Sequence, residues 1–192
     1  RRRKHLVRAR ILLTVAAIGV VAAVAMRQRW QWLREHRHDA LIRSAAAQHG
    51  LPAELVKAVV WRESRFDAGA MGSKGEIGLM QVTGDAAQEW ADARRDRRFD
   101  RMHLLDPATN LHAGSFYLSK VSRRYGATDS PFAYALADYN AGRGNVLRWM
   151  KGAAQTNAQA FLESMTFPGT REYVRSILRR APGYRDDFAT AP

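Results

Sequence analysis

The 192-residue sequence contains no cysteine. This absence excludes a disulfide framework, a zinc site built from thiolates and a lipid-modified N-terminal cysteine. The sequence also lacks convincing runs of alternating polar and apolar residues, so it does not predict an extended β-sheet. No internal repeat recurs at the periods typical of solenoid proteins. We therefore expect one globular domain, mainly α-helical, that is stabilised by its apolar core.

Acidic residues are scarce at the N-terminal end, and this shortage accounts for most of the net charge of +13. Residues 1–43 contain 11 lysines and arginines but only 2 acidic residues, whereas residues 44–192 contain 20 and 16. A nucleic-acid-binding domain would carry its excess positive charge on the folded part. The distribution predicts no nucleic-acid partner and a mildly basic domain that suits an acidic polymer.

The N-terminal residues have the pattern of an export signal. Residues 1–10 form a basic flank, expected to be cytoplasmic, and residues 11–26 are apolar except for Thr14. Ala23-Val24-Ala25 resembles the cleavage site of a signal peptide, whereas the arginines that follow favour an uncleaved signal anchor. Both interpretations stay open. A buried core helix fits less well, because the segment is apolar on all faces. Residues 27–39 are then a juxtamembrane linker.

The pattern of residues 40–188 predicts one domain, large enough for a catalytic domain, of helices joined by short loops. Pro52 in a first helical turn and the Asp106-Pro107 pair are typical helix starts, and Gly50 is a typical stop. The loop with Gly69, Gly72, Gly75 and Gly78 cannot be a long regular element, although a small β-hairpin fits residues 70–82. Helices are predicted over residues 40–49, 51–64, 83–95, 106–126, 130–142, 143–152 and 170–180.

Glu63 lies near a predicted helix end, after an apolar stretch that includes Val59 and Val60. Apolar surroundings disfavour the charged form of a carboxyl and raise its pKa. A glutamic acid that keeps its proton near neutral pH can act as a general acid. The alternative is an exposed glutamate at a helix end that pairs with Arg62 or Arg65.

Three short blocks resemble the signature motifs of the soluble lytic transglycosylase family, in the same order. They are Glu63-Ser64, Gly78-Leu79-Met80-Gln81 and Ala137-Asp138-Tyr139-Asn140-Ala141-Gly142. The similarity runs from about Ala40 to Leu178. It implies a lysozyme-like fold of the goose-type-lysozyme and transglycosylase kind, acting on the peptidoglycan of the bacterial periplasm. Two departures stand out: Val82-Thr83-Gly84-Asp85 replaces a proline-containing turn, and Gly169 stands where the family often has Glu.

The resemblance also implies residue roles. Glu63 would protonate the oxygen between N-acetylmuramic acid and N-acetylglucosamine, then act as base toward the muramic acid 6-hydroxyl, giving a 1,6-anhydro end. Tyr139 would lie near Glu63 as a second catalytic residue. Substrate-binding residues would be Ser64, Ser73, Met80, Gln81 and Asn140, although local capping is an equally good reading of the serines and of Asn140. No cofactor is implied, and the six histidines show no spacing that predicts a metal site.

Glu76 is the second acidic residue near Glu63 in the sequence. Its role decides between hydrolysis by water and formation of a 1,6-anhydro end. Glycosidases commonly use two carboxyl groups, so a catalytic Glu76 would indicate a muramidase that uses water. A Glu76 that only braces its glycine-rich loop would leave Glu63 to act alone. A third possibility, from another functional class, is a peptidoglycan-binding scaffold without activity.

Overall fold

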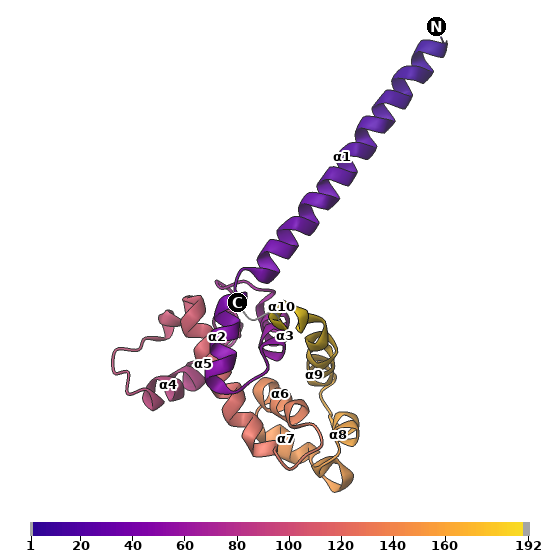
Figure 1. The fold of residues 1–192 in the computed structure, drawn as a ribbon. Coiled ribbons are helices and arrows are strands. Elements are labelled where there is room, and N and C mark those ends of the chain that lie inside the picture. Colours follow the sequence, from indigo (N-terminus) through magenta and orange to yellow (C-terminus); the bar gives the residue numbers. More distant parts are fainter. Residues whose placement is uncertain (1, 190–192) are drawn as a thin grey trace. The chain divides into compact units, whose positions relative to one another are not determined.

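The structure is a computed structural model that describes residues 2–189, without the side chains of residues 2 and 4–13. The chain divides after Arg37 into two units. The first is one long helix, α1 (Arg2–His36) (Figure 1). Residue 1 and the side chains of most of the predicted basic flank lie outside this description. No helix in the described part of the chain is both long and apolar enough to span a membrane. The expected signal anchor or signal peptide over residues 11–26 stays a prediction, and the side chains of residues 11–13 lie outside the described part.

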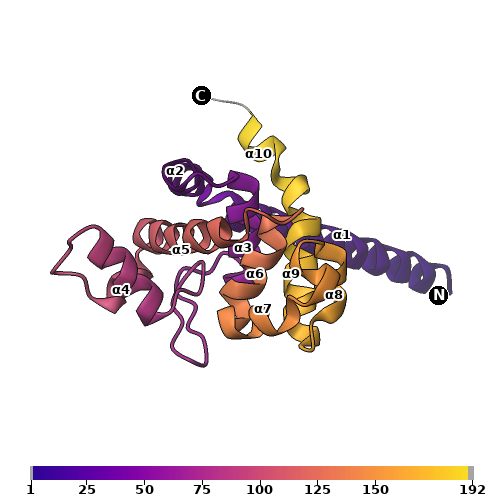
Figure 2. The ribbon, with the colours of Figure 1, turned by 90° about the horizontal axis from the view of Figure 1, so that it is seen from below.

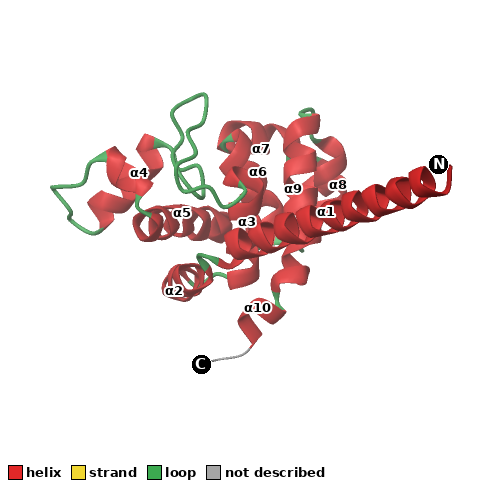
Figure 3. Cartoon of the chain, turned by 90° about the horizontal axis from the view of Figure 1, so that it is seen from above, coloured by secondary structure: helices red, strands yellow, loops and turns green. Residues whose placement is uncertain are grey.

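The second unit confirms the prediction of a mainly α-helical domain (Figure 3). Its α-helices are α2 (Asp39–His49), α3 (Ala53–Ser64), α4 (Gly84–Ala93), α5 (Pro107–Ser122), α6 (Pro131–Ala141), α7 (Arg143–Trp149), α8 (Ala158–Ser164), α9 (Pro168–Arg180) and α10 (Asp186–Ala189). Short 3-10 turns are η1 (Arg101–Leu105), η2 (Arg123–Tyr125), η3 (Gly152–Gln155) and η4 (Ala181–Tyr184). The possible hairpin is reduced to isolated bridges of Ile77 with Met71 and Val82, and the described residues form no strand.

The predicted start of α5 is seen in its capping contacts. The Asp106 carboxylate accepts hydrogen bonds from the backbone N–H of Thr109 at 2.8 Å and from its hydroxyl at 2.9 Å. Pro107 occupies the first turn, where its missing N–H leaves no helical hydrogen bond unmade. Pro131 starts α6 in the same way, but the Ser130 side chain makes no capping bond. Thr83 caps α4 by accepting from Ala86.

One apolar core holds these helices together, and α3 lies inside it (Figure 2). Helix α3 packs against α2, α9 and η4, while α5 packs against α2, α4 and α6, and α6 also packs against α9. The inner face of α3 is formed by Leu55, Val56, Val59 and Val60, all of them buried as their helical spacing predicts. The catalytic candidate Glu63 follows this stripe on the last turn of α3.

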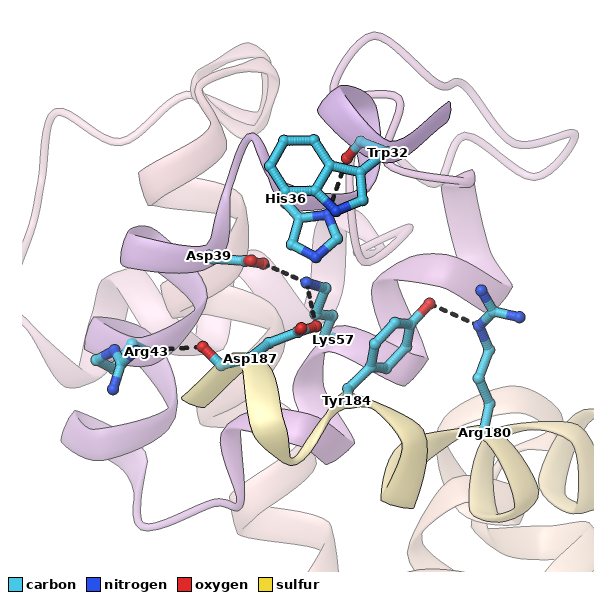
Figure 4. A network of polar contacts seen from close by, with 8 residues as sticks. All are labelled: Trp32, His36, Asp39, Arg43, Lys57, Arg180, Tyr184 and Asp187. Atoms are coloured by element: carbon cyan, nitrogen blue, oxygen red, sulfur yellow. Dashed lines mark hydrogen bonds and ion pairs between the residues drawn. The ribbon is translucent and has the colours of Figure 1, made fainter. Parts of the chain in front are cut away.

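A buried ion cluster attaches the C-terminal segment to α3. The Lys57 side chain has no exposed surface, and its ammonium lies 2.7 Å from both Asp39 of α2 and Asp187 of α10 (Figure 4). The ring of Tyr184 in η4 lies 5.0 Å from the same nitrogen. Since a buried charge is tolerated only when it is paired, this cluster fixes both ends of the domain on the helix that carries Glu63.

Candidate active site

Glu63 is a partly buried carboxyl whose direct partner is a tyrosine. Its Oε1 accepts a hydrogen bond from the Tyr173 hydroxyl at 2.6 Å. Burial raises the pKa of Glu63 to about 7, against the opposing effects of the Tyr173 hydrogen bond and the Arg62 charge, and the charge of Glu76 adds a small increase. The reading of Glu63 as an exposed, ion-paired glutamate does not hold, because its close partner is a phenol inside the domain. This carboxyl can release and accept a proton near neutral pH.

Tyr173 is the site residue that sequence reasoning missed. It belongs to α9 and is only 2% exposed. Burial and the nearby Glu63 raise the pKa of its phenol well above the usual value, so the hydroxyl is a permanent donor at neutral pH. Its position in the stretch Thr170-Arg171-Glu172-Tyr173-Val174 was the available signal. The same stretch follows Gly169, which stands where the family often has Glu.

Tyr139 lies beside Glu63 but does not point its hydroxyl at the carboxyl. The Tyr139 hydroxyl donates to the Met80 carbonyl at 2.8 Å, and its ring packs edge-on against Tyr117 at 5.7 Å between centroids. Burial first, and then the charge of Glu63, raise the pKa of Tyr139 well above its usual value. Tyr139 therefore joins α6 to the loop after α3.

Ser64 and Met80 are built into the structure that supports the site. The buried Ser64 hydroxyl donates to the carbonyls of Leu79 at 2.8 Å and Val60 at 3.2 Å, which ties the loop to the end of α3. The Met80 side chain is fully buried against α5. Both side chains are engaged within the domain, and contacts of Ser64 and Met80 with substrate stay predictions. The other expected contacts lie closer to the surface.

Gln81 and Asn140 are more exposed, yet both already make internal hydrogen bonds. The Gln81 amide donates to the carbonyls of Ala70 at 3.1 Å and Gly78 at 3.0 Å, and its backbone has a positive φ of 47°. The Asn140 side chain accepts from the Thr170 hydroxyl at 2.8 Å and so links α6 to α9. Each residue keeps polar atoms with which a sugar could still bond.

Ser73 and Glu76 lie on the glycine-rich loop. The Ser73 side chain is exposed. Glu76 accepts a hydrogen bond from the Lys74 backbone N–H at 3.0 Å, and its own carbonyl accepts from Gly72 at 2.7 Å. These contacts are those of a carboxylate that braces its own loop, while its charge still reaches Glu63.

Asn110, a buried residue of α5, holds this loop in place. Its structural role was not predicted from the sequence. The Asn110 amide donates to the carbonyls of Ile77 at 2.7 Å and Leu104 at 2.9 Å, and its oxygen accepts from the Met80 N–H at 2.8 Å. Gly78 allows this approach: it has φ of 77°, and a Cβ there would lie 2.3 Å from the Asn110 amide nitrogen. Larger residues cannot occupy that position.

A glutamate whose pKa is raised to about 7, and which accepts a hydrogen bond from a buried tyrosine, can serve as a general acid or base. Comparison with known families identifies the class of protein. The model of the Transglycosylase SLT domain matches residues 40–162, and the chain belongs to this family. Its lysozyme-like fold, expected from the sequence motifs, is thereby confirmed.

Several relatives have the same domain within longer proteins. The soluble lytic murein transglycosylase of Escherichia coli (strain K12) is 29% identical over 170 residues, covering 86% of this chain and 26% of that protein. The membrane-bound lytic murein transglycosylase C of Yersinia enterocolitica is 33% identical over 122 residues, covering 60% of this chain and 34% of that protein. The chain thus spans about a quarter to a third of the length of these relatives.

Two solved structures share the fold. An inactive glutamate-to-glutamine variant of the lytic transglycosylase Slt from Pseudomonas aeruginosa has a TM-score of 0.72 and 28% identity, covering 81% of this chain and 25% of that one. The 70-kDa soluble lytic transglycosylase in complex with bulgecin A has a TM-score of 0.70 and 29% identity, with the same coverage.

Proposed function

We propose that the domain is a peptidoglycan lytic transglycosylase that cleaves the bond between N-acetylmuramic acid and N-acetylglucosamine. The observation that carries this proposal is the pKa of Glu63, raised to about 7 by burial, because it lets one carboxyl both give and take a proton. Family membership and the inactive glutamate variant of the Pseudomonas aeruginosa relative support it.

In the proposed reaction, protonated Glu63 donates its proton to the glycosidic oxygen as the bond from that oxygen to C1 breaks. The Tyr173 hydroxyl stabilises the carboxylate that forms, since it already donates to Oε1. The Glu63 carboxylate then takes the proton of the muramic acid 6-hydroxyl, whose oxygen bonds to C1. Water is not consumed, and Glu63 ends protonated as it began.

Glu76 is the carboxyl group that would favour a muramidase instead, since its charge raises the pKa of Glu63 slightly. Its oxygen is engaged by the Lys74 N–H, which favours the bracing role. Tyr139 stabilises the loop beside Glu63 through its hydrogen bond to the Met80 carbonyl. The polar contacts to the glycan come from Ser73, which is exposed, and from Gln81 and Asn140.

The products decide among the candidate functions. Purified peptidoglycan is digested with the chain, and released fragments are analysed by mass spectrometry. We expect anhydro-muropeptides, which are lighter by one water than hydrolysis products. Reducing ends would indicate a muramidase, and binding without release would indicate a scaffold.

Placement at the inner membrane, with the domain in the periplasm, is part of the same proposal. The apolar side chains Val15, Ile18 and Val21 are exposed along α1, which suits either a lipid contact or a signal peptide that is later removed. Fractionation of expressing bacteria tests this placement: the chain should appear with the envelope, and a wholly cytosolic chain would contradict it.

A further inference from the structure

Arg62 stands next to Glu63 on the last turn of α3. Its side chain is partly buried. Within the described residues, no salt bridge engages its guanidinium, in contrast to Lys57 and Arg124, which both pair with aspartates. A cation withdrawn from water without a partner needs some other compensation.

The compensation comes from the tyrosine that bonds Glu63. The Arg62 guanidinium carbon lies 5.4 Å from the centre of the Tyr173 ring, within the range of a cation–π contact. The hydroxyl of the same ring donates to Glu63 Oε1 at 2.6 Å. The three side chains therefore form a chain of contacts in which the cation lies against the ring and the phenol points at the carboxyl.

We propose that Arg62 is a positioning residue that holds Tyr173 as the hydrogen-bond donor to Glu63 and supplies positive charge to the carboxylate. A cation over the ring withdraws electron density from the phenol and strengthens its O–H as a donor. This inference deepens the proposed function, because it concerns how the proposed acid is prepared for both of its steps.

The groups that act on Glu63 set the direction of the effect. Burial is the largest influence on the Glu63 pKa and raises it, whereas the Tyr173 hydrogen bond and the Arg62 charge lower it, in that order. Glu76, from the loop, raises it slightly. Tyr139, from α6, stays neutral because burial raises its own pKa. Arg62 is the cation in this set, so its removal should leave the carboxyl protonated to higher pH.

The test is a titration of the Glu63 carboxyl in the full chain, followed by ¹³C NMR of labelled glutamate and assigned with Glu63→Gln. We expect Arg62→Gln to move the midpoint upward by about half a pH unit, the size of a cation–carboxylate interaction in a partly solvated site. Arg62→Lys should recover part of this shift, since it restores charge without the planar contact.

Arg65→Gln is the matched control, because Arg65 makes a similar cation–π contact with Trp61, at 3.9 Å, and is not among the groups that shift the pKa of Glu63. The titration midpoint of Glu63 in Arg65→Gln should equal that in the unaltered chain. An unchanged or lowered midpoint in folded Arg62→Gln would overturn the proposal. Because the titration reads the carboxyl directly, its outcome is separate from whether anhydro products are released.

Discussion

Replacing Tyr173 by Phe removes the hydroxyl that donates to Glu63 and leaves the ring in place. Hydrogen bonds to charged groups contribute about 1.5–3 kcal/mol, and one pKa unit corresponds to about 1.4 kcal/mol. Losing the 2.6 Å bond should therefore raise the pKa of Glu63 by about one unit or more above its present value near 7. The carboxyl becomes a weaker acid and keeps its proton to higher pH.

The assay is the rate of release of soluble fragments from peptidoglycan between pH 5 and pH 9, both ends chosen to bracket the pKa near 7. We expect Tyr173→Phe to move the high-pH limb upward by about one pH unit and to lower the maximal rate roughly tenfold. Tyr134→Phe is the control, since it removes another buried tyrosyl hydrogen bond, to the Ala154 carbonyl, and Tyr134 is not among the groups that shift the pKa of Glu63. A limb that stays fixed in Tyr173→Phe would refute the reasoning.

Three further predictions concern stability. Asn110→Ala leaves the buried partners of its amide without bonds and should lower the free energy of unfolding by about 2–4 kcal/mol in urea melts. Asp187→Asn weakens the pairing of buried Lys57 and should cost about 1–2 kcal/mol, measured in the same way; no loss would contradict the role of the ion cluster. Burial is the main cause that lowers the pKa of His49 and of His112 from 6.5, so the unfolded chain binds protons more readily than the folded chain. The contribution of these histidines to stability should be complete above pH 6.5 and should decrease as the pH falls below it. Thermal melts at about pH 5 and about pH 7.5 check this prediction.

The sequence predicts most of the helices because their signals are local. Asp106-Pro107 marks the start of α5, and the apolar spacing of α3 places Glu63 after a buried stripe. Helix α8 has no comparable signal apart from Asn157, whose side chain caps it, and it was not predicted. The pattern of a basic segment followed by an apolar one predicts a signal anchor or a signal peptide, and this stays a prediction.

The site could be predicted only as far as motifs name residues, because contacts between distant segments have no local signal. Tyr173 is 110 positions from Glu63, and nothing in its neighbours indicates which carboxyl it bonds. Ser64 and Met80 were expected at the glycan, yet one closes the end of α3 and the other fills the core beside α5. Their motif positions reflect the support of the loop as much as contact with substrate.

The central claim is that Glu63 alone carries out both proton transfers, and a comparison of two isosteric variants tests it most directly. Glu63→Gln and Glu76→Gln each remove one carboxyl and keep its shape, and both are assayed on purified peptidoglycan with mass analysis of the products. The account predicts that Glu63→Gln releases no anhydro-muropeptides, whereas Glu76→Gln releases them at close to the normal rate. Full activity in Glu63→Gln, or loss of activity in folded Glu76→Gln, would contradict it.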